Sequence, residues 1–353
     1  MNSSSVFCLI LFCSVFYPFA GAQDGQNPFP SGDRRTAEQA YNRSVEKIVL
    51  HDYAKALAAL DDALMADPLF AEAFLLRSRV KFQLGDHYDA ITDVNRAVEL
   101  NSFLGEAYFL RAFYAFAVDT AGLKGDDLEK AIQLGYNDAS AYYYRGLYAL
   151  MKGHPAEAIP DFNTAIEKRP GYARAYNDRG TARIGKGDFQ GAIYDFKVAV
   201  SLDPGLAVAY ANMGNAKMKI GDYQGALSDF NQALKIDTSL TEVHNYRGEA
   251  GLITGDIDLA RNDFNRVLTL DPLDGFALCG IGNVHMKLGE LEKAQEYFDR
   301  AIALYPGLGE AFLNRGMLLE LKGDLEGACS DWRMAEALGI EASGEFLKEC
   351  HKP

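Results

Sequence analysis

Residues that could perform catalysis or bind a metal ion are spread along this sequence without forming a recognisable motif. The chain contains six histidines and 49 acidic residues, but no phosphate-binding loop, nucleophile elbow, zinc-protease helix or paired-cysteine motif. The histidines share no spacing that would bring three of them to one ion; they are His51, His87, His154, His244, His285 and His351. We therefore expect no enzymatic activity, no metal and no cofactor.

Several of these side chains have a structural explanation. Asp188, Asp222 and Asp256 each follow a glycine and precede a helical run, a place where an aspartate side chain caps a helix. We expect His244 and His285 to lie near a binding surface, and we interpret both as uninvolved side chains.

The cysteines suggest one covalent link. Cys329 falls in the last long helical run, and Cys350 ends a terminal segment that should fold back over that run. We predict a disulfide between them, as an oxidising compartment would permit, with Cys279 left as a free thiol. The alternative is that both are small buried residues of a helical core.

The first residues of the chain are typical of a targeting segment. Residues 1–23 contain no charged side chain, an apolar stretch runs from Val6 to Phe19, and Ala20-Gly21-Ala22 fits a cleavage pattern. We expect a signal peptide over residues 1–22 that is cleaved from a secreted or periplasmic protein. The alternative is an uncleaved segment that anchors the protein, and only then would the protein contact a membrane.

The charge of the chain restricts the class of partner. Its formal net charge is −14, so its surface would repel nucleic-acid phosphates and anionic lipids. We expect no nucleic-acid binding, and a soluble protein or peptide partner with neutral or basic patches.

The elements that position all these residues come from a 34-residue repeat. Residues 37–342 divide into nine blocks of this length without a gap, and they begin at Ala37, Ala71, Gly105, Ala139, Ala173, Ala207, Thr241, Gly275 and Gly309. Position eight is always small, position twenty is alanine in every block except at Lys124, and position twenty-four is always apolar. Small residues let two helices of a hairpin approach closely, and Gly-Asp at positions fifteen and sixteen ends one helix and caps the next.

This pattern resembles the tetratricopeptide repeat family, as in "AYNDRGTARIGKGDFQGAIYDFKVAVSLDP" from Ala175 to Pro204. The resemblance implies an all-α fold, an α-α superhelix (solenoid) of about nine helical hairpins. We expect a signal peptide over 1–22, a disordered leader over 23–36, nine repeats over 37–342 and a capping helix over 343–353. Block three should have a shortened second helix, and Pro160 should kink the second helix of block four.

The resemblance also implies that the first helices line a concave groove that binds polypeptides. The residues at groove positions in blocks two to four are apolar, namely Leu75, Phe82, Phe109, Phe113, Phe116, Tyr143 and Leu147. Later blocks present asparagines, namely Asn177, Asn212, Asn215, Asn245, Asn283 and Asn314. The apolar residues could take the hydrophobic face of a partner helix, and the asparagines could bond to an extended peptide backbone. The alternative is that the apolar residues are core and the asparagines are only solvated.

The resulting hypothesis is a scaffold or adaptor that binds protein partners in its groove outside the cytoplasm. The alternative is a structural homo-oligomer that assembles through the apolar groove of repeats two to four.

Overall fold

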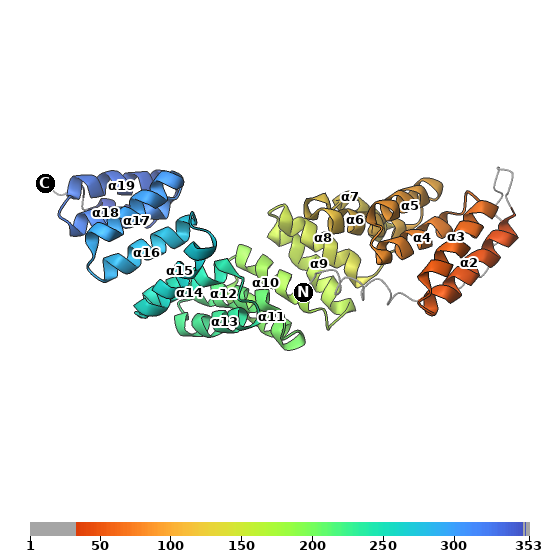
Figure 1. Cartoon of the computed structure of the whole chain (residues 1–353), viewed down its shortest axis with the longest axis horizontal. Coiled ribbons are helices and arrows are strands. Elements are labelled where there is room, and N and C mark those ends of the chain that lie inside the picture. The colour runs from red at the N-terminus through yellow and green to blue at the C-terminus, as the bar shows by residue number, and fades with distance from the viewer. Residues whose placement is uncertain (1–32, 349, 351–353) are drawn as a thin grey trace. The chain divides into compact units, whose positions relative to one another are not determined.

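The described part of the chain is entirely helical. The computed structural model describes residues 33–348 and Cys350, and none of these residues belongs to a strand (Figure 1). The expected fold class, an all-α array of helical hairpins, is confirmed. The expected signal peptide and most of the expected leader lie outside the described residues.

The helices follow the predicted blocks. The first helices of the hairpins are α2 (Arg34–Val49), α4 (Ala71–Leu84), α6 (Gly105–Val118), α8 (Ala139–Met151), α10 (Ala173–Gly185), α12 (Ala207–Lys219), α14 (Thr241–Thr254), α16 (Gly275–Lys287) and α18 (Gly309–Leu321). The second helices are α3 (Tyr53–Ala66), α5 (His87–Leu100), α7 (Gly125–Gln133), α9 (Pro155–Lys168), α11 (Phe189–Leu202), α13 (Tyr223–Ile236), α15 (Ile257–Leu270), α17 (Leu291–Leu304) and α19 (Leu325–Ala337). The short helix α20 (Ser343–Leu347) follows them.

One boundary differs from the prediction. Helix α2 begins at Arg34, so the last residues assigned to a disordered leader are helical. The reason is a cap that the repeat pattern did not include, because the Asp33 side chain accepts a hydrogen bond of 3.1 Å from the Thr36 backbone N–H.

The helices form two compact units. Unit 1 ends at Pro170, and unit 2 runs from Gly171 onward. Within each unit the two helices of a hairpin pack on each other, and the second helix packs on the first helix of the next hairpin. Each hairpin therefore buries its apolar residues against its sequence neighbours.

The hairpins are held close by glycine packing against an aromatic ring. A Cβ atom on Gly214 of α12 would lie 2.5 Å from Cε1 of Phe230 on α13, closer than two carbon atoms can approach. Gly180 and Phe196 repeat this arrangement in the preceding hairpin. The small residue at position eight therefore faces the large residue at position twenty-four, and in these two hairpins only glycine fits against the phenylalanine ring.

The turns also follow the predicted chemistry. Gly187 has a φ of +76°, which an L side chain rarely adopts, and Asp188 then accepts a hydrogen bond of 2.9 Å from the Gly191 N–H. Asp222 and Asp256 cap α13 and α15 in the same way. These aspartates are helix caps, as expected.

The two unusual blocks have different outcomes. Helix α7 of block three has nine residues and begins after a 3₁₀ turn, η1 (Thr120–Gly122), so the predicted shortening is confirmed. In block four, α9 continues on both sides of Pro160, from Pro155 to Lys168. Pro160 removes one hydrogen bond without ending the helix, and the kink expected at this residue stays a prediction.

Buried ion pairs join the two helices of six hairpins, a feature that the sequence analysis did not anticipate. In each pair an arginine of the first helix bonds through two nitrogens to an aspartate sixteen residues later. The pairs are Arg77 with Asp93, Arg111 with Asp127, Arg145 with Asp161, Arg179 with Asp195, Arg247 with Asp263, and Arg315 with Asp331.

Candidate protein-binding surface

Most of the apolar residues assigned to a partner-binding groove are buried in the fold. Five of the seven expose no more than 8% of their surface: Leu75, Phe82, Phe109, Phe113 and Tyr143. Phe116 and Leu147 are half-buried. The predicted apolar binding patch is therefore wrong for these five residues, which belong to the core.

The physical reason is aromatic packing within unit 1. Phe82 stacks on Tyr114 with ring centroids 4.2 Å apart, and Phe109 stacks on Tyr136 at 4.9 Å. Phe113 meets the edge of Tyr144 at 5.4 Å. These rings are long enough to reach from one helix to the next, so they fill the space between helices instead of lining an open surface. The homo-oligomer hypothesis loses the surface on which it depended.

The first two asparagines of the polar set bond to neighbouring residues. Asn177 is buried on α10 and donates a hydrogen bond of 2.9 Å to the Asp178 carboxylate. Its own oxygen accepts from the Asn212 side chain on α12 at 3.1 Å. This pair links consecutive first helices.

Two further asparagines carry oxygens that lack a donor. The side-chain Oδ1 atoms of Asn245 and Asn283 are shielded from solvent and have no hydrogen-bond partner within the described part of the chain. Asn245 Nδ2 lies 3.4 Å from Asp274 Oδ1, at the N-terminus of α16. Asn215 and Asn314 are half-buried. A shielded acceptor without a donor costs free energy that a ligand N–H would recover.

These asparagines lie along a row of first helices in unit 2. Contacts join α10 to α12, α12 to α14, α14 to α16 and α16 to α18, whereas successive second helices contact each other less. The row of first helices is therefore the closer-packed, inner side of unit 2. We call it the first-helix face.

Glu249 of α14 is an acidic side chain on this face. Its side chain is exposed, yet burial among surrounding helices raises the pKa of its carboxyl. The Glu310 carboxylate adds to this rise, and Lys219 opposes it.

A pocket lies in unit 1, beside the short helix α7. It has a volume of about 620 Å³ and is lined by residues of α7, α8 and α9, including Tyr148 and Arg145. The Arg145 guanidinium bonds to the Asp161 and Glu129 carboxylates, which satisfies its charge without a ligand.

His244, His285 and the free cysteine have partners in the fold or are buried in it. His244 Nδ1 lies 2.7 Å from Asp263, and His285 stacks on the Tyr297 ring. Within residues 33–348 and Cys350, no three His, Cys, Asp or Glu side chains are placed to hold a metal ion. Cys279 on α16 is a buried free thiol, and burial raises its pKa to about 12.

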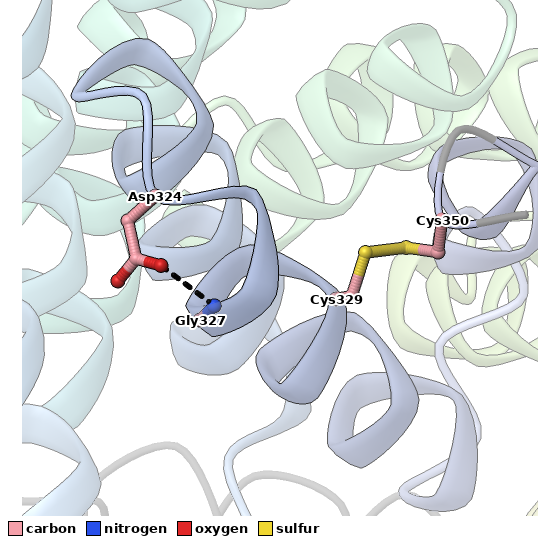
Figure 2. Close-up of a disulfide and its surroundings, with 4 residues drawn as sticks. All are labelled: Asp324, Gly327, Cys329 and Cys350. Carbon is pink, nitrogen blue, oxygen red and sulfur yellow. Dashed lines mark hydrogen bonds between the residues drawn. A yellow bond between two sulfur atoms is a disulfide. The ribbon is translucent and has the colours of Figure 1, made fainter. Parts of the chain in front are cut away.

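A disulfide ties the end of the chain to α19. Figure 2 shows the bond between Cys329 and Cys350, whose Cα atoms lie 5.8 Å apart. Phe346 of α20 stacks on Trp332 of α19 with ring centroids 5.2 Å apart. The bond and the stacked rings together hold the terminal segment against the last hairpin.

Comparison with known families gives the chain its classification. Models described as tetratricopeptide repeat match residues 41–104, 126–172, 145–207, 207–239 and 276–308, which is more than half of the sequence. The chain belongs to the tetratricopeptide repeat family. No curated protein matches it. Among its described helices, none is long and apolar enough to cross a membrane.

Solved tetratricopeptide repeat structures share its fold at low identity. The Cut9–Hcn1 hetero-tetramer of the APC/C is 16% identical over 93% of this chain and 79% of that chain, with a TM-score of 0.57. A repeat protein from Parabacteroides merdae is 16% identical over 79% of this chain and 97% of that chain, with a TM-score of 0.51. PilF of Pseudomonas aeruginosa is 21% identical over 60% of this chain and 97% of that chain, with a TM-score of 0.50. These likenesses show the fold.

Proposed function

We propose that this protein is a scaffold that binds polypeptide partners on the first-helix face of unit 2 and performs no reaction of its own. One observation carries the proposal: Asn245 and Asn283 hold shielded oxygens that have no donor among the residues the structure describes. An unmet buried acceptor costs about 1–3 kcal/mol, and a ligand that draws the amide outward and donates to it gains part of that free energy on binding. A peptide backbone offers such donors at regular intervals.

The repeat architecture supports this proposal. A solenoid that adds one hairpin at a time presents an extended surface, which suits an extended ligand better than a compact one. An asparagine side chain both donates and accepts, so it can bond to a peptide backbone whatever the neighbouring side chains are. Binding of this kind selects polypeptides as a class and leaves sequence preference to other residues.

We further propose that the protein acts outside the cytoplasm. The uncharged apolar segment within residues 1–22 supports export, and the Cys329–Cys350 disulfide suits an oxidising compartment. N-terminal sequencing of the protein secreted by an expression host tests this. Cleavage before Gln23 is the expected result, and a chain that keeps residues 1–22 would support the membrane-anchored alternative.

A selection experiment tests the binding surface. Linear peptides displayed on phage are selected on the purified protein, and their affinities are compared for two double variants. In one, Asn245→Leu and Asn283→Leu alter the first-helix face. In the control, Asn262→Leu and Asn265→Leu alter exposed asparagines of α15.

The face variant should bind selected peptides about tenfold more weakly or worse, as expected when at least one hydrogen bond is lost. The control should bind as the unaltered protein does. Equal binding by both variants would place the ligand elsewhere and reject the proposal.

A further inference from the structure

The first-helix face of unit 2 carries an exposed aromatic ring between two acidic side chains. Phe276 on α16 leaves 62% of its surface exposed, so packing within the fold does not account for it. The neighbouring first helices hold exposed glutamates 34 residues away in each direction, Glu242 on α14 and Glu310 on α18. Because the repeat places equivalent positions side by side, the ring is flanked by carboxylates on both sides.

Phe276 lies on the same side of α16 as Asn283, one of the two asparagines whose side-chain oxygen has no donor among the described residues. Phe276 and Asn283 are seven residues apart, which is two helical turns, so they lie on one side of α16. Asn245 and Glu249 are one turn apart and share a side of α14. Because α14 contacts α16, these side chains line a common strip.

The strip contains more acceptors than donors. Helix α18 contacts α16, and the Glu310 carboxylate at its start contributes to the raised pKa of both Glu249 and Cys279. Lys219 at the end of α12 acts on Glu249 from the other side and offsets part of this negative charge. The chemical complement of such a strip is a group with several donors, a positive charge and a flat face.

A guanidinium group has these three properties. It is planar, it carries five N–H donors and it stacks on aromatic rings, whereas the ammonium group of lysine is a compact point charge. Arginine can therefore stack on an aromatic ring, pair with carboxylates and donate hydrogen bonds to amide oxygens.

We infer that this cation-binding strip, formed by Glu242, Asn245, Glu249, Phe276, Asn283 and Glu310, binds an arginine-containing segment of the polypeptide partner. This inference rests on the proposed function and adds the side-chain class that the surface prefers. A bound segment would stack an arginine on the Phe276 ring between the glutamates and direct donors toward the asparagine oxygens.

Fluorescence anisotropy with defined peptides tests the inference at one physiological salt concentration. The probe is a labelled peptide of alternating glycine and arginine, compared with peptides that carry citrulline or lysine in place of arginine. Citrulline keeps the shape of arginine and removes its charge. The expected order of affinity is arginine, then lysine, then citrulline.

Matched variants separate the strip from general attraction to an acidic protein. Glu249→Gln with Glu310→Gln should weaken binding of the arginine peptide roughly tenfold, the loss of two exposed ion pairs. Phe276→Ala should weaken it by about threefold. Asp258→Asn with Glu292→Gln removes the same charge from exposed positions on α15 and α17 and should change affinity by less than about twofold.

Two results would overturn the inference: equal loss in the strip and control variants, or equal binding of the citrulline and arginine peptides. Phage selection separates this failure from failure of the proposed function. Selected peptides that bind the first-helix face but lack arginine would leave the proposed function standing and reject the preference. Absence of any ligand on that face would reject the proposed function itself.

Discussion

The buried ion pair of block five offers a test of what holds the hairpins together. Asp195 has no exposed surface, and it accepts from Arg179 Nε at 2.9 Å and from Arg179 Nη2 at 2.6 Å. Arg183 lies 3.2 Å from the same carboxylate. Asp195→Ala removes the counter-charge that Arg179 and Arg183 share, while both guanidinium groups stay largely shielded from water. Breaking a buried pair in this way costs about 3–5 kcal/mol of the free energy of unfolding.

Urea is the appropriate denaturant for this measurement, because guanidinium chloride would screen the ion pair. Circular dichroism should show a much lower urea midpoint for Asp195→Ala. The double variant Asp195→Ala with Arg179→Met should be less destabilised than the two single changes added together, since it removes both partners. Asp258→Ala, at an exposed position of α15, should shift the free energy of unfolding by less than about 0.5 kcal/mol. A loss below about 1 kcal/mol for Asp195→Ala, or additivity in the double variant, would refute the reasoning.

Three other predictions follow from single features. Burial raises the pKa of the Asp229 carboxyl, and Lys217 opposes this rise, so the ionised form of Asp229 is disfavoured in the folded state. The free energy of unfolding should therefore fall as pH rises from 3.8, the pKa in the unfolded chain, through the higher pKa of the folded state. Asp229→Asn should abolish that fall, and an unchanged pH profile by urea titration would contradict this. Hydrogen exchange should be faster at residues 119–126 than in the turns of the flanking blocks, because α7 is short; uniform protection would oppose this. Thiol counting on the unfolded, unreduced mature protein should find one free cysteine, Cys279, whereas three would show that the disulfide is absent in solution.

The fold was predictable because its determinants are local and repeated. The contact between Gly180 and Phe196 recurs at the same two positions, so a single sequence shows six versions of a glycine packed on an aromatic ring. Turn chemistry was equally visible, since Gly187-Asp188 ends one helix and caps the next. The start of α2 was missed because its cap, Asp33, lies before the first repeat.

The candidate surface was less predictable because the positions assigned to the groove differ in exposure. Phe109, at position five of block three, is buried against Tyr136, whereas Phe276, at position two of block eight, is open to solvent. The ion pairs could have been predicted from the sequence, because arginine at position seven recurs together with aspartate at position twenty-three, as in Arg179 and Asp195.

The central claim is that polypeptides bind on the first-helix face of unit 2, and hydrogen exchange with and without a selected peptide tests it most directly. Saturating peptide should slow exchange in α14 and α16 and leave α15 and α17 unchanged, because the ligand covers Asn245 and Asn283 on the first helices alone. Protection confined to the second helices or to unit 1, with none in α14 and α16, would contradict the account.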